Sequence, residues 1–183
     1  MVWIIIWVVV VLGIYIVSQY NGIIKLRNNR ENAFADIDTQ LKLRFDLIPN
    51  LVNTVQGYAK HEKELLENVT KARTEFLGAG SADAKMDANN MLTGALKSMF
   101  AVSENYPDLK ANQNFLQMQT ELSDIENKIA ASRRFFNSAT KEFNNHLETF
   151  PTNIIGGMFN FSRVNSFELE NREEEWKAVE VKF

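Results

Sequence analysis

The sequence predicts an all-α protein in which an N-terminal transmembrane helix is continuous with a long, antiparallel, up-and-down helical bundle that packs like a coiled coil. Two observations lead to this prediction. Residues 1–17 are almost unbroken in apolar character, and two later stretches, 23–59 and 115–150, place apolar side chains at steps of three and four. Such steps put these side chains on one face of a helix, and each long apolar face requires a partner helix.

The membrane anchor is assigned to residues 1–22. Trp3, Trp7 and Tyr15 lie near the two ends of the apolar run, where aromatic rings favour the membrane interface. At about 1.5 Å per residue, the helix from Val2 to Ile24 measures roughly 33 Å, which is enough to cross a bilayer. The rival interpretation, a cleaved signal peptide, requires a basic start and a small-residue cleavage site, and this stretch has neither.

Basic residues after the apolar run set the expected orientation. Lys25, Arg27 and Arg30 follow the run closely. The positive-inside bias therefore places the N-terminus outside and the bundle in the cytoplasm. We expect a single-pass protein of the cell (inner) membrane, with the opposite orientation as the alternative.

Helix breakers divide the remaining chain into a helical bundle, 23–150, and a C-terminal tail, 151–183. The expected helices cover about 23–77, 84–104 and 110–150, and the tail holds a short helix and an extended segment at Val179–Phe183. Pro49 removes one backbone hydrogen bond from the first helix. We therefore expect a kink or a short break at Asp46–Asn50.

The third helix is expected to run back antiparallel to the first, so that aligned residue numbers add up to about 173 at equal helical rise. This register sets Arg44 near Glu126 and Asp38 near Arg133, and we predict two interhelical ion pairs. Pairs of this kind fix register more reliably than they add stability. Asparagines also recur along the helices, Asn144 among them. A buried amide fixes which helices meet, and a solvated or capping role is the alternative.

Phenylalanines concentrate in the membrane-proximal half and the tail, and in that half only two helices are expected to pair. Exposed apolar area of this extent usually marks an interaction site. The predicted self-association or tail-docking surface consists of Phe34, Phe45, Phe135, Phe136, Phe143 and Phe150. Either the tail or neighbouring copies in the plane of the bilayer would cover it.

Composition and motifs argue against an enzyme and against nucleic acid as a partner. The formal net charge of −3 over 183 residues indicates no basic surface, and the absence of cysteine excludes disulfides and thiolate zinc sites. His61-Glu62 begins like a zinc-protease motif, but Leu65 stands where the second histidine is required. The carboxylates around Asp38 and Glu126 lack the histidines of a helical-bundle metal site. We therefore predict no catalytic, cofactor-binding or metal-binding residues.

Three stretches of the chain are distinctive. They read YNGIIKLRNNRENAFADIDTQLKLRFDLIPNLVNTVQGYAKHE, YPDLKANQNFLQMQTELSDIENKIAASRRFFNSATKEFN and NHLETFPTNIIGGMF, and together they closely resemble the LemA family. The resemblance implies a single-pass bacterial membrane protein with a long helical bundle. It also implies a role in membrane organisation, because one relative is associated with magnetosome membrane formation. The chain departs from the family at Phe136-Asn137, where tyrosine is more usual, and the family pattern supplies no catalytic residue.

These observations favour a membrane-anchored, non-enzymatic helical scaffold that self-associates and organises the membrane or membrane-protein partners. The expected partners are further copies of the chain, the lipid bilayer and a membrane protein. The alternative is a monomeric adaptor that regulates an integral membrane enzyme such as a protease.

Overall fold

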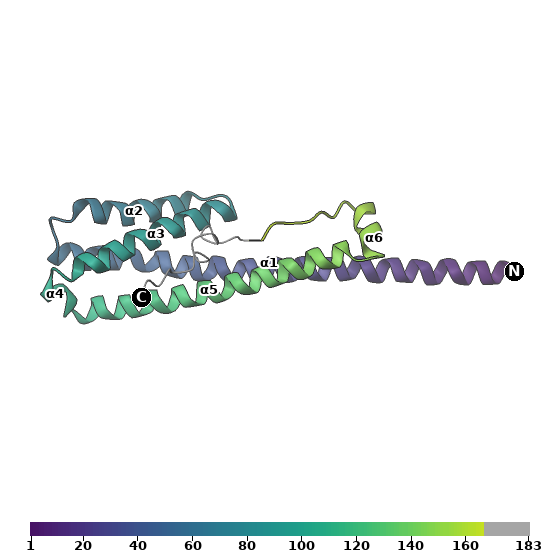
Figure 1. Ribbon diagram of the computed structural model, residues 1–183, viewed down its shortest axis with the longest axis horizontal. Coiled ribbons are helices and arrows are strands. Elements are labelled where there is room, and N and C mark those ends of the chain that lie inside the picture. The colour runs from purple at the N-terminus through teal and green to yellow at the C-terminus, as the bar shows by residue number, and fades with distance from the viewer. Residues whose placement is uncertain (167–183) are drawn as a thin grey trace, which may run out of the picture. The chain divides into compact units, whose positions relative to one another are not determined.

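The computed structural model describes residues 1–166, and the regular elements in this range are all α-helices. In chain order they are α1 (Val2–Tyr58), α2 (Lys63–Gly78), α3 (Ala82–Ser103), α4 (Pro107–Lys110), α5 (Gln113–Glu148) and α6 (Thr152–Met158) (Figure 1). The predicted all-α class is therefore confirmed. The chain divides into two compact units, and each unit takes one part of α1 and one part of α5. Unit 1 consists of Met1–Ala35 and Ser132–Phe183, and unit 2 consists of Asp36–Ala131.

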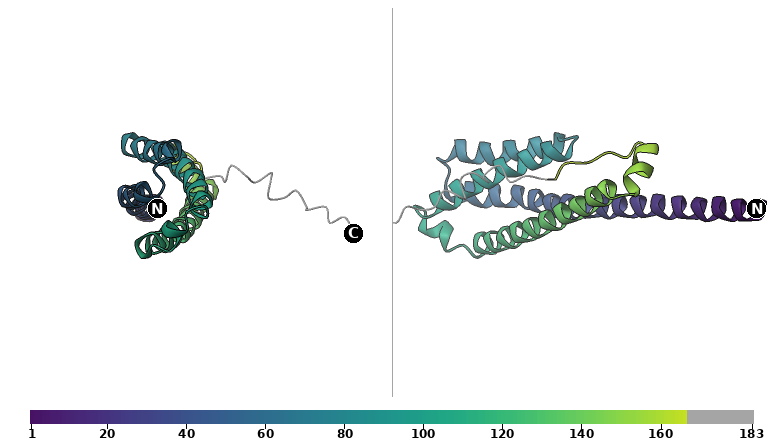
Figure 2. Two further views of the ribbon diagram at one scale, coloured as in Figure 1. Left: turned by 90° about the vertical axis from the view of Figure 1, so that its left-hand side faces the viewer. Right: turned by 45° about the vertical axis from the view of Figure 1, so that its right-hand side comes forward.

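Unit 2 is a helical bundle in which α2 and α3 lie side by side (Figures 1 and 2). The buried face of α2 follows the steps of three and four that an amphipathic helix requires. It consists of Leu66, Val69, Ala72 and Phe76. Helix α3 begins after Ser81, whose side-chain oxygen accepts a hydrogen bond from the backbone N–H of Ala84 at 3.2 Å. This bond satisfies one of the free N–H groups at the helix start, which explains why the chain turns helical again here.

The predicted single helix over 23–77 is wrong, because the chain forms two helices there and reverses between them. The expected break at Asp46–Asn50 does not occur, since α1 stays helical through Pro49. Pro49 is exposed, whereas Ile48 and Leu51 beside it are buried. Burial of this apolar face holds the helix together although the proline removes one backbone hydrogen bond.

The reversal lies instead at residues 59–62. The backbone N–H of Glu62 donates to the carbonyl oxygen of Ala59 at 3.2 Å, and α2 starts directly afterwards. Folding back lets the apolar face of α2 bury against α1, a partner that one straight helix would lack. The rings of Phe45 and Phe76 accordingly stack with their centroids 4.1 Å apart.

Unit 1 pairs the start of α1 with the end of α5 in antiparallel fashion. Phe34 meets Phe136 edge to face at 6.0 Å between ring centroids, and Arg30 Nε donates to Thr140 Oγ1 at 3.2 Å. In both contacts the residue numbers add up to 170, close to the sum expected from equal helical rise. The helix expected over 110–150 is divided in the structure into α4 and α5.

After α5, the short helix expected in the tail is present as α6. The extended segment expected at Val179–Phe183 lies outside the described residues. At the other end of the chain, α1 is long and apolar enough to cross a membrane, by length and composition. Its most apolar window has a mean hydropathy of 2.4, and none of that window is buried against the described protein.

Candidate functional site

The most completely buried charge in unit 2 belongs to Arg44, which is 3% exposed. Its Nη1 lies 2.7 Å from Glu126 Oε2, donates to Thr93 Oγ1 at 3.0 Å and also donates to the side-chain oxygen of Asn89. A buried guanidinium requires such partners, because an uncompensated charge in the protein interior is very costly. The structure thus brings together Arg44 and Glu126, the first predicted pair.

Sequence reasoning missed the two α3 residues of this network. Asn89 is buried, and its side-chain oxygen accepts a hydrogen bond from Arg44. No sequence motif marks this role, since asparagine within a helix more often indicates a solvated position. The signal that could have found it is the Asn89-Asn90 pair inside an otherwise apolar helix. The Arg44–Glu126 contact is an ion pair rather than a well-directed hydrogen bond, because Glu126 Oε2 accepts no hydrogen bond among the described residues.

Asp38 pairs with Lys85 of α3, a partner that the sequence reasoning did not anticipate. The second predicted pair, Asp38 with Arg133, joins residues of different units and stays a prediction. Lys85 also lies over the ring of Phe76, with Nζ 5.8 Å from the centroid. The ion pair and the aromatic ring therefore bind α3 to both α1 and α2 within unit 2.

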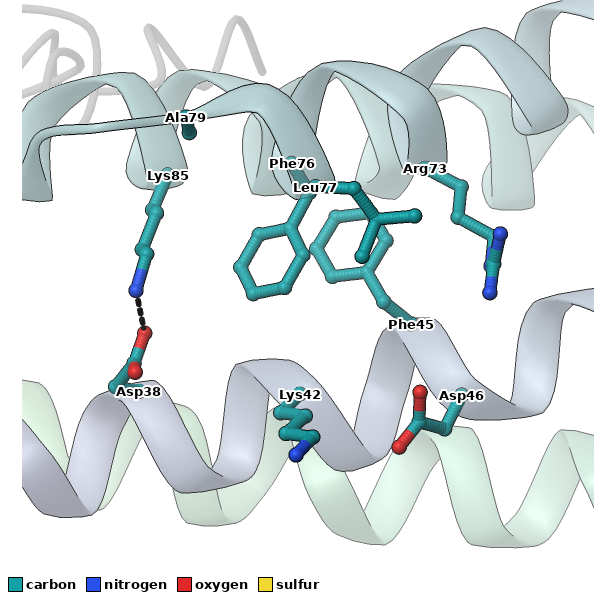
Figure 3. Close-up of a pocket in the computed structure, with 9 residues that line it drawn as sticks. All are labelled: Asp38, Lys42, Phe45, Asp46, Arg73, Phe76, Leu77, Ala79 and Lys85. Carbon is teal, nitrogen blue, oxygen red and sulfur yellow. Dashed lines mark hydrogen bonds and ion pairs between the residues drawn. The ribbon is translucent and has the colours of Figure 1, made fainter.

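The Asp38–Lys85 pair forms one end of a pocket of about 250 Å³ between α1 and the α2–α3 connection (Figure 3). The stacked rings of Phe45 and Phe76 lie in its middle, and Asp46 and Arg73 face each other at the far end. Arg73 Nε is buried and has no hydrogen-bond partner among the described residues. The lining combines charged side chains with two aromatic rings and has neither histidine nor a hydroxyl side chain.

Six phenylalanines were predicted to form a self-association or tail-docking surface, and three of them are buried in the structure. Phe45, Phe136 and Phe143 are buried, and Phe34 is half-buried against Phe136. Phe45 stacks on Phe76 of α2, and Phe136 packs against Phe34 and Arg30 of α1. Phe143 belongs to an apolar cluster on which Phe161 and Val164 of the tail pack. The exposed members of the set are Phe135, at 58%, and Phe150, at 76%.

The tail segment 159–164 covers the apolar cluster of unit 1 that contains Ile23, Phe143 and Leu147. Phe161 and Val164 pack against this cluster. Asn144 holds the segment in place through two hydrogen bonds to the backbone of Val164: the side-chain N–H donates to its carbonyl oxygen at 2.8 Å, and the side-chain oxygen accepts from its N–H at 3.0 Å. Docking of the tail, one of the two expected ways of covering the phenylalanines, is therefore present within the described residues.

Two observations on the described residues bear on catalytic chemistry: the grouping of potential metal ligands and the pKa of Tyr106. No group of three or more His, Asp or Glu residues in residues 1–166 is placed to hold a metal ion. Among the described residues, the surroundings of Tyr106 shift the pKa of its phenol. Its hydroxyl donates to Glu62 Oε1 at 2.9 Å, and this bond, with burial and the carboxylate charge as smaller causes, raises the pKa of the phenol.

These features define a class: an antiparallel helical protein whose first helix carries an uncovered apolar segment of membrane length, and whose buried charge, Arg44, is held by polar partners. The family model described as LemA family matches residues 33–183, and the chain belongs to the LemA family. Protein LemA of Metamycoplasma hominis is 29% identical over 83% of this chain and 70% of its own length.

Two further relatives are Magnetosome protein MamQ 2 of Paramagnetospirillum magneticum and Magnetosome protein MamQ of Magnetospirillum gryphiswaldense. The first is 22% identical over 84% of this chain and 66% of its own length. The second is 21% identical over 83% of this chain and 65% of its own length. The chain thus spans slightly less than two thirds of the length of these MamQ relatives, and none of the relatives' names is that of an enzyme.

Proposed function

We propose that the chain is a membrane-anchored, non-enzymatic helical scaffold that self-associates and organises the membrane or its proteins. The observation that carries the proposal is the uncovered apolar segment of α1, which runs into the bundle as one helix, Val2–Tyr58, without a linker. In water such a segment would expose a large apolar area, whereas a bilayer removes that cost. The relatives named as magnetosome proteins agree with the membrane-organising role that the family resemblance implies.

Self-association is supported by an apolar ring that the described chain leaves uncovered. Phe135 of α5 is 58% exposed, while its neighbour Phe136 is buried. Large exposed aromatic side chains are enriched at sites where proteins meet. In the plane of a bilayer, anchored copies stay at high local concentration, which favours contacts too weak to form in dilute solution.

Cross-linking of the full chain in native membranes tests self-association. Wild-type protein is expected to give cross-linked oligomers, and Phe135→Ala is expected to reduce their yield several-fold. Leu116→Ala is the matched control, because Leu116 is also an exposed apolar residue of α5. A strictly monomeric wild-type species would refute self-association, and equal losses from both variants would refute the assignment of the surface to Phe135.

The cytoplasmic placement of the bundle is part of the proposal and rests on Lys25, Arg27 and Arg30. The connection between α2 and α3, residues 79–81, offers a short non-helical target for a protease. Cleavage there is expected only after cells are lysed. Cleavage in spheroplasts with an intact membrane would show the opposite orientation.

The pocket of unit 2 favours the second candidate, a monomeric adaptor for an integral membrane enzyme. Its volume of about 250 Å³ accommodates one side chain of a partner, with Arg73 available for an acidic group and the Phe45–Phe76 stack for an apolar one. This candidate predicts one stoichiometric partner on affinity capture, and Arg73→Ala is expected to lose it. Retention of the same partner by Arg73→Ala would exclude the pocket as its binding site.

A further inference from the structure

Helix α6 lies beside α1 at the level where the apolar segment of α1 ends (Figures 1 and 2). The apolar run stops at Val17, and Gln19 lies just beyond it. The hydroxyl of Thr152, the first residue of α6, donates a hydrogen bond to Gln19 Oε1 at 3.0 Å. One residue further along α1, the ring of Tyr20 packs on Phe159 with centroids 4.8 Å apart. A bilayer that holds the apolar segment therefore has its surface at α6.

The loop that contains α6 carries no charge. Residues 149–162 include no Asp, Glu, Lys or Arg side chain. The charged residues that flank the loop, Glu148 and Arg163, pair with each other, with Nη1 and Oε1 3.1 Å apart. The charges thus stay at the base of the loop, and the loop itself presents only uncharged groups. Uncharged groups enter the edge of the hydrocarbon layer at far lower cost than charged ones.

The two faces of α6 differ. One face is buried on unit 1 through Thr152, Ile155 and Gly156. A Cβ atom at Gly156 would lie 3.0 Å from Leu147 Cδ2, which is tighter than an ordinary contact, so α6 packs closely on the end of α5.

The opposite face exposes large apolar side chains. Ile154 is 57% exposed and Met158 is 68% exposed, and their spacing of four residues places them on one side of the helix. Phe150, just before the helix, is 76% exposed. Together they form an apolar patch that the described residues leave uncovered.

We propose that this patch, Phe150, Ile154 and Met158, inserts into the interfacial layer of the bilayer as a second membrane contact beside the span. The inference rests on the membrane anchorage proposed above. Lipid is the occupant that the structure favours over a second copy, because the patch is continuous in level with the apolar segment of α1 and its loop has no charge to orient a protein partner. The contact has the form of a short monotopic element, with its apolar side in the acyl boundary and its other side on the protein.

Site-specific spin labels on the full chain in nanodiscs test this inference. Because the sequence has no cysteine, single variants such as Ile154→Cys and Met158→Cys take up one label each. The measured quantity is the accessibility of each label to oxygen, which concentrates in lipid, and to a water-soluble nickel chelate. Val10→Cys in the apolar segment reports the lipid environment. Glu31→Cys, exposed on α1 and roughly 20 Å beyond Val17, reports the aqueous one.

Labels at 154 and 158 are expected to prefer oxygen several-fold over the nickel chelate relative to the label at 31, at a shallower depth than the label at 10. An aqueous profile at 154 and 158 with a lipid profile at 10 would overturn the inference and leave the anchor intact. Protection of both positions from both reagents would overturn it in favour of contact with a second copy. An aqueous profile at 10 would overturn the anchor and this inference together.

Discussion

Arg44 Nη1 lies 2.7 Å from Glu126 Oε2, and the two residues differ sharply in exposure: the arginine side chain is 4% exposed and the glutamate side chain 41%. Replacement of a buried charge leaves its polar partners unsatisfied, here Asn89 above all. We expect Arg44→Met to lower the free energy of unfolding by about 3 kcal/mol. Urea denaturation of the full chain in a mild detergent, followed by circular dichroism, measures this change.

The matched variant Glu126→Gln is expected to cost only about 1 kcal/mol, because Arg44 keeps its hydrogen bonds to Asn89 and Thr93. If Arg44→Met unfolds with the same urea midpoint as the wild type, the hydrogen-bond and ion-pair network around Arg44 adds nothing to stability. A double variant gives the coupling energy between the two residues directly.

Pro49 lies inside α1 at an exposed position, so its replacement removes a defect without opening a cavity. Pro49→Ala restores a backbone N–H that bonds to the carbonyl four residues earlier. We expect the free energy of unfolding to rise by about 1–3 kcal/mol, as measured by urea denaturation. Asn50→Ala, next to it and also exposed, is the control and is expected to change stability by less than about 0.5 kcal/mol. A loss of stability in Pro49→Ala would mean that unit 2 requires the geometry that the proline imposes.

Asn144 holds the tail segment 159–164 on the apolar cluster of unit 1. With two hydrogen bonds removed, Asn144→Ala is expected to release this segment at a cost of about 1–3 kcal/mol. Hydrogen exchange followed by mass spectrometry is expected to show faster exchange confined to 159–164 and the cluster it covers. Asn145→Ala is the control, because Asn145 is exposed and its neighbour makes both bonds. Unchanged hydrogen exchange in Asn144→Ala would show that the Asn144 side chain does not hold the segment 159–164 in place.

The contribution of Tyr106 to the stability of unit 2 is expected to be lost at alkaline pH. Its pKa is raised in the folded chain above the ordinary value near 10.0, so the folded state holds the phenolic proton more tightly than the unfolded state does. The stabilising contribution is therefore complete below about pH 10 and disappears as the pH rises through the folded pKa. Titration of tyrosinate absorbance is expected to show one tyrosine that ionises late in the wild type and is missing from Tyr106→Phe.

Glu62→Gln provides the matching control for Tyr106, since it keeps an oxygen acceptor but removes the carboxylate charge. The late tyrosine is expected to ionise at lower pH in this variant. If the titration of Glu62→Gln is identical to that of the wild type, the hydrogen bond between these two residues does not control the phenol.

The apolar steps of three and four predicted helical structure over 23–59 and 115–150 and its antiparallel pairing, although the first helix was wrongly extended to residue 77. The same register placed Arg44 beside Glu126, because helical rise alone converts residue numbers into levels along a rod. The position of the reversal in the first half was not predictable in this way. Pro49 is the stronger local signal, yet it lies within α1, and the chain turns at residues 59–62 because α2 needs an apolar partner.

The candidate surfaces were harder to predict than the helices. Periodicity assigned Phe45 to the apolar face of one helix, and Phe136 and Phe143 to that of another, but did not reveal which segments cover these faces. The hydrogen bonds of Asn144 to Val164 depend on a tail that folds back over α5. A single asparagine in a helix carries too little information to specify that path. Local patterns thus determined the elements, while long-range contacts determined which rings stay exposed.

The hydrogen bond from Thr152 to Gln19 joins residues that are 133 positions apart in the chain. A solitary helix crossing a bilayer is free to swivel about its own axis. The hydrogen bond between Thr152 and Gln19 ties α1 to the segment after α5, so that rotation of α1 about its axis carries the whole of unit 1 with it. With α6 at the lipid surface, as proposed above, the tilt of α1 in the bilayer would set the tilt of unit 1 above the membrane.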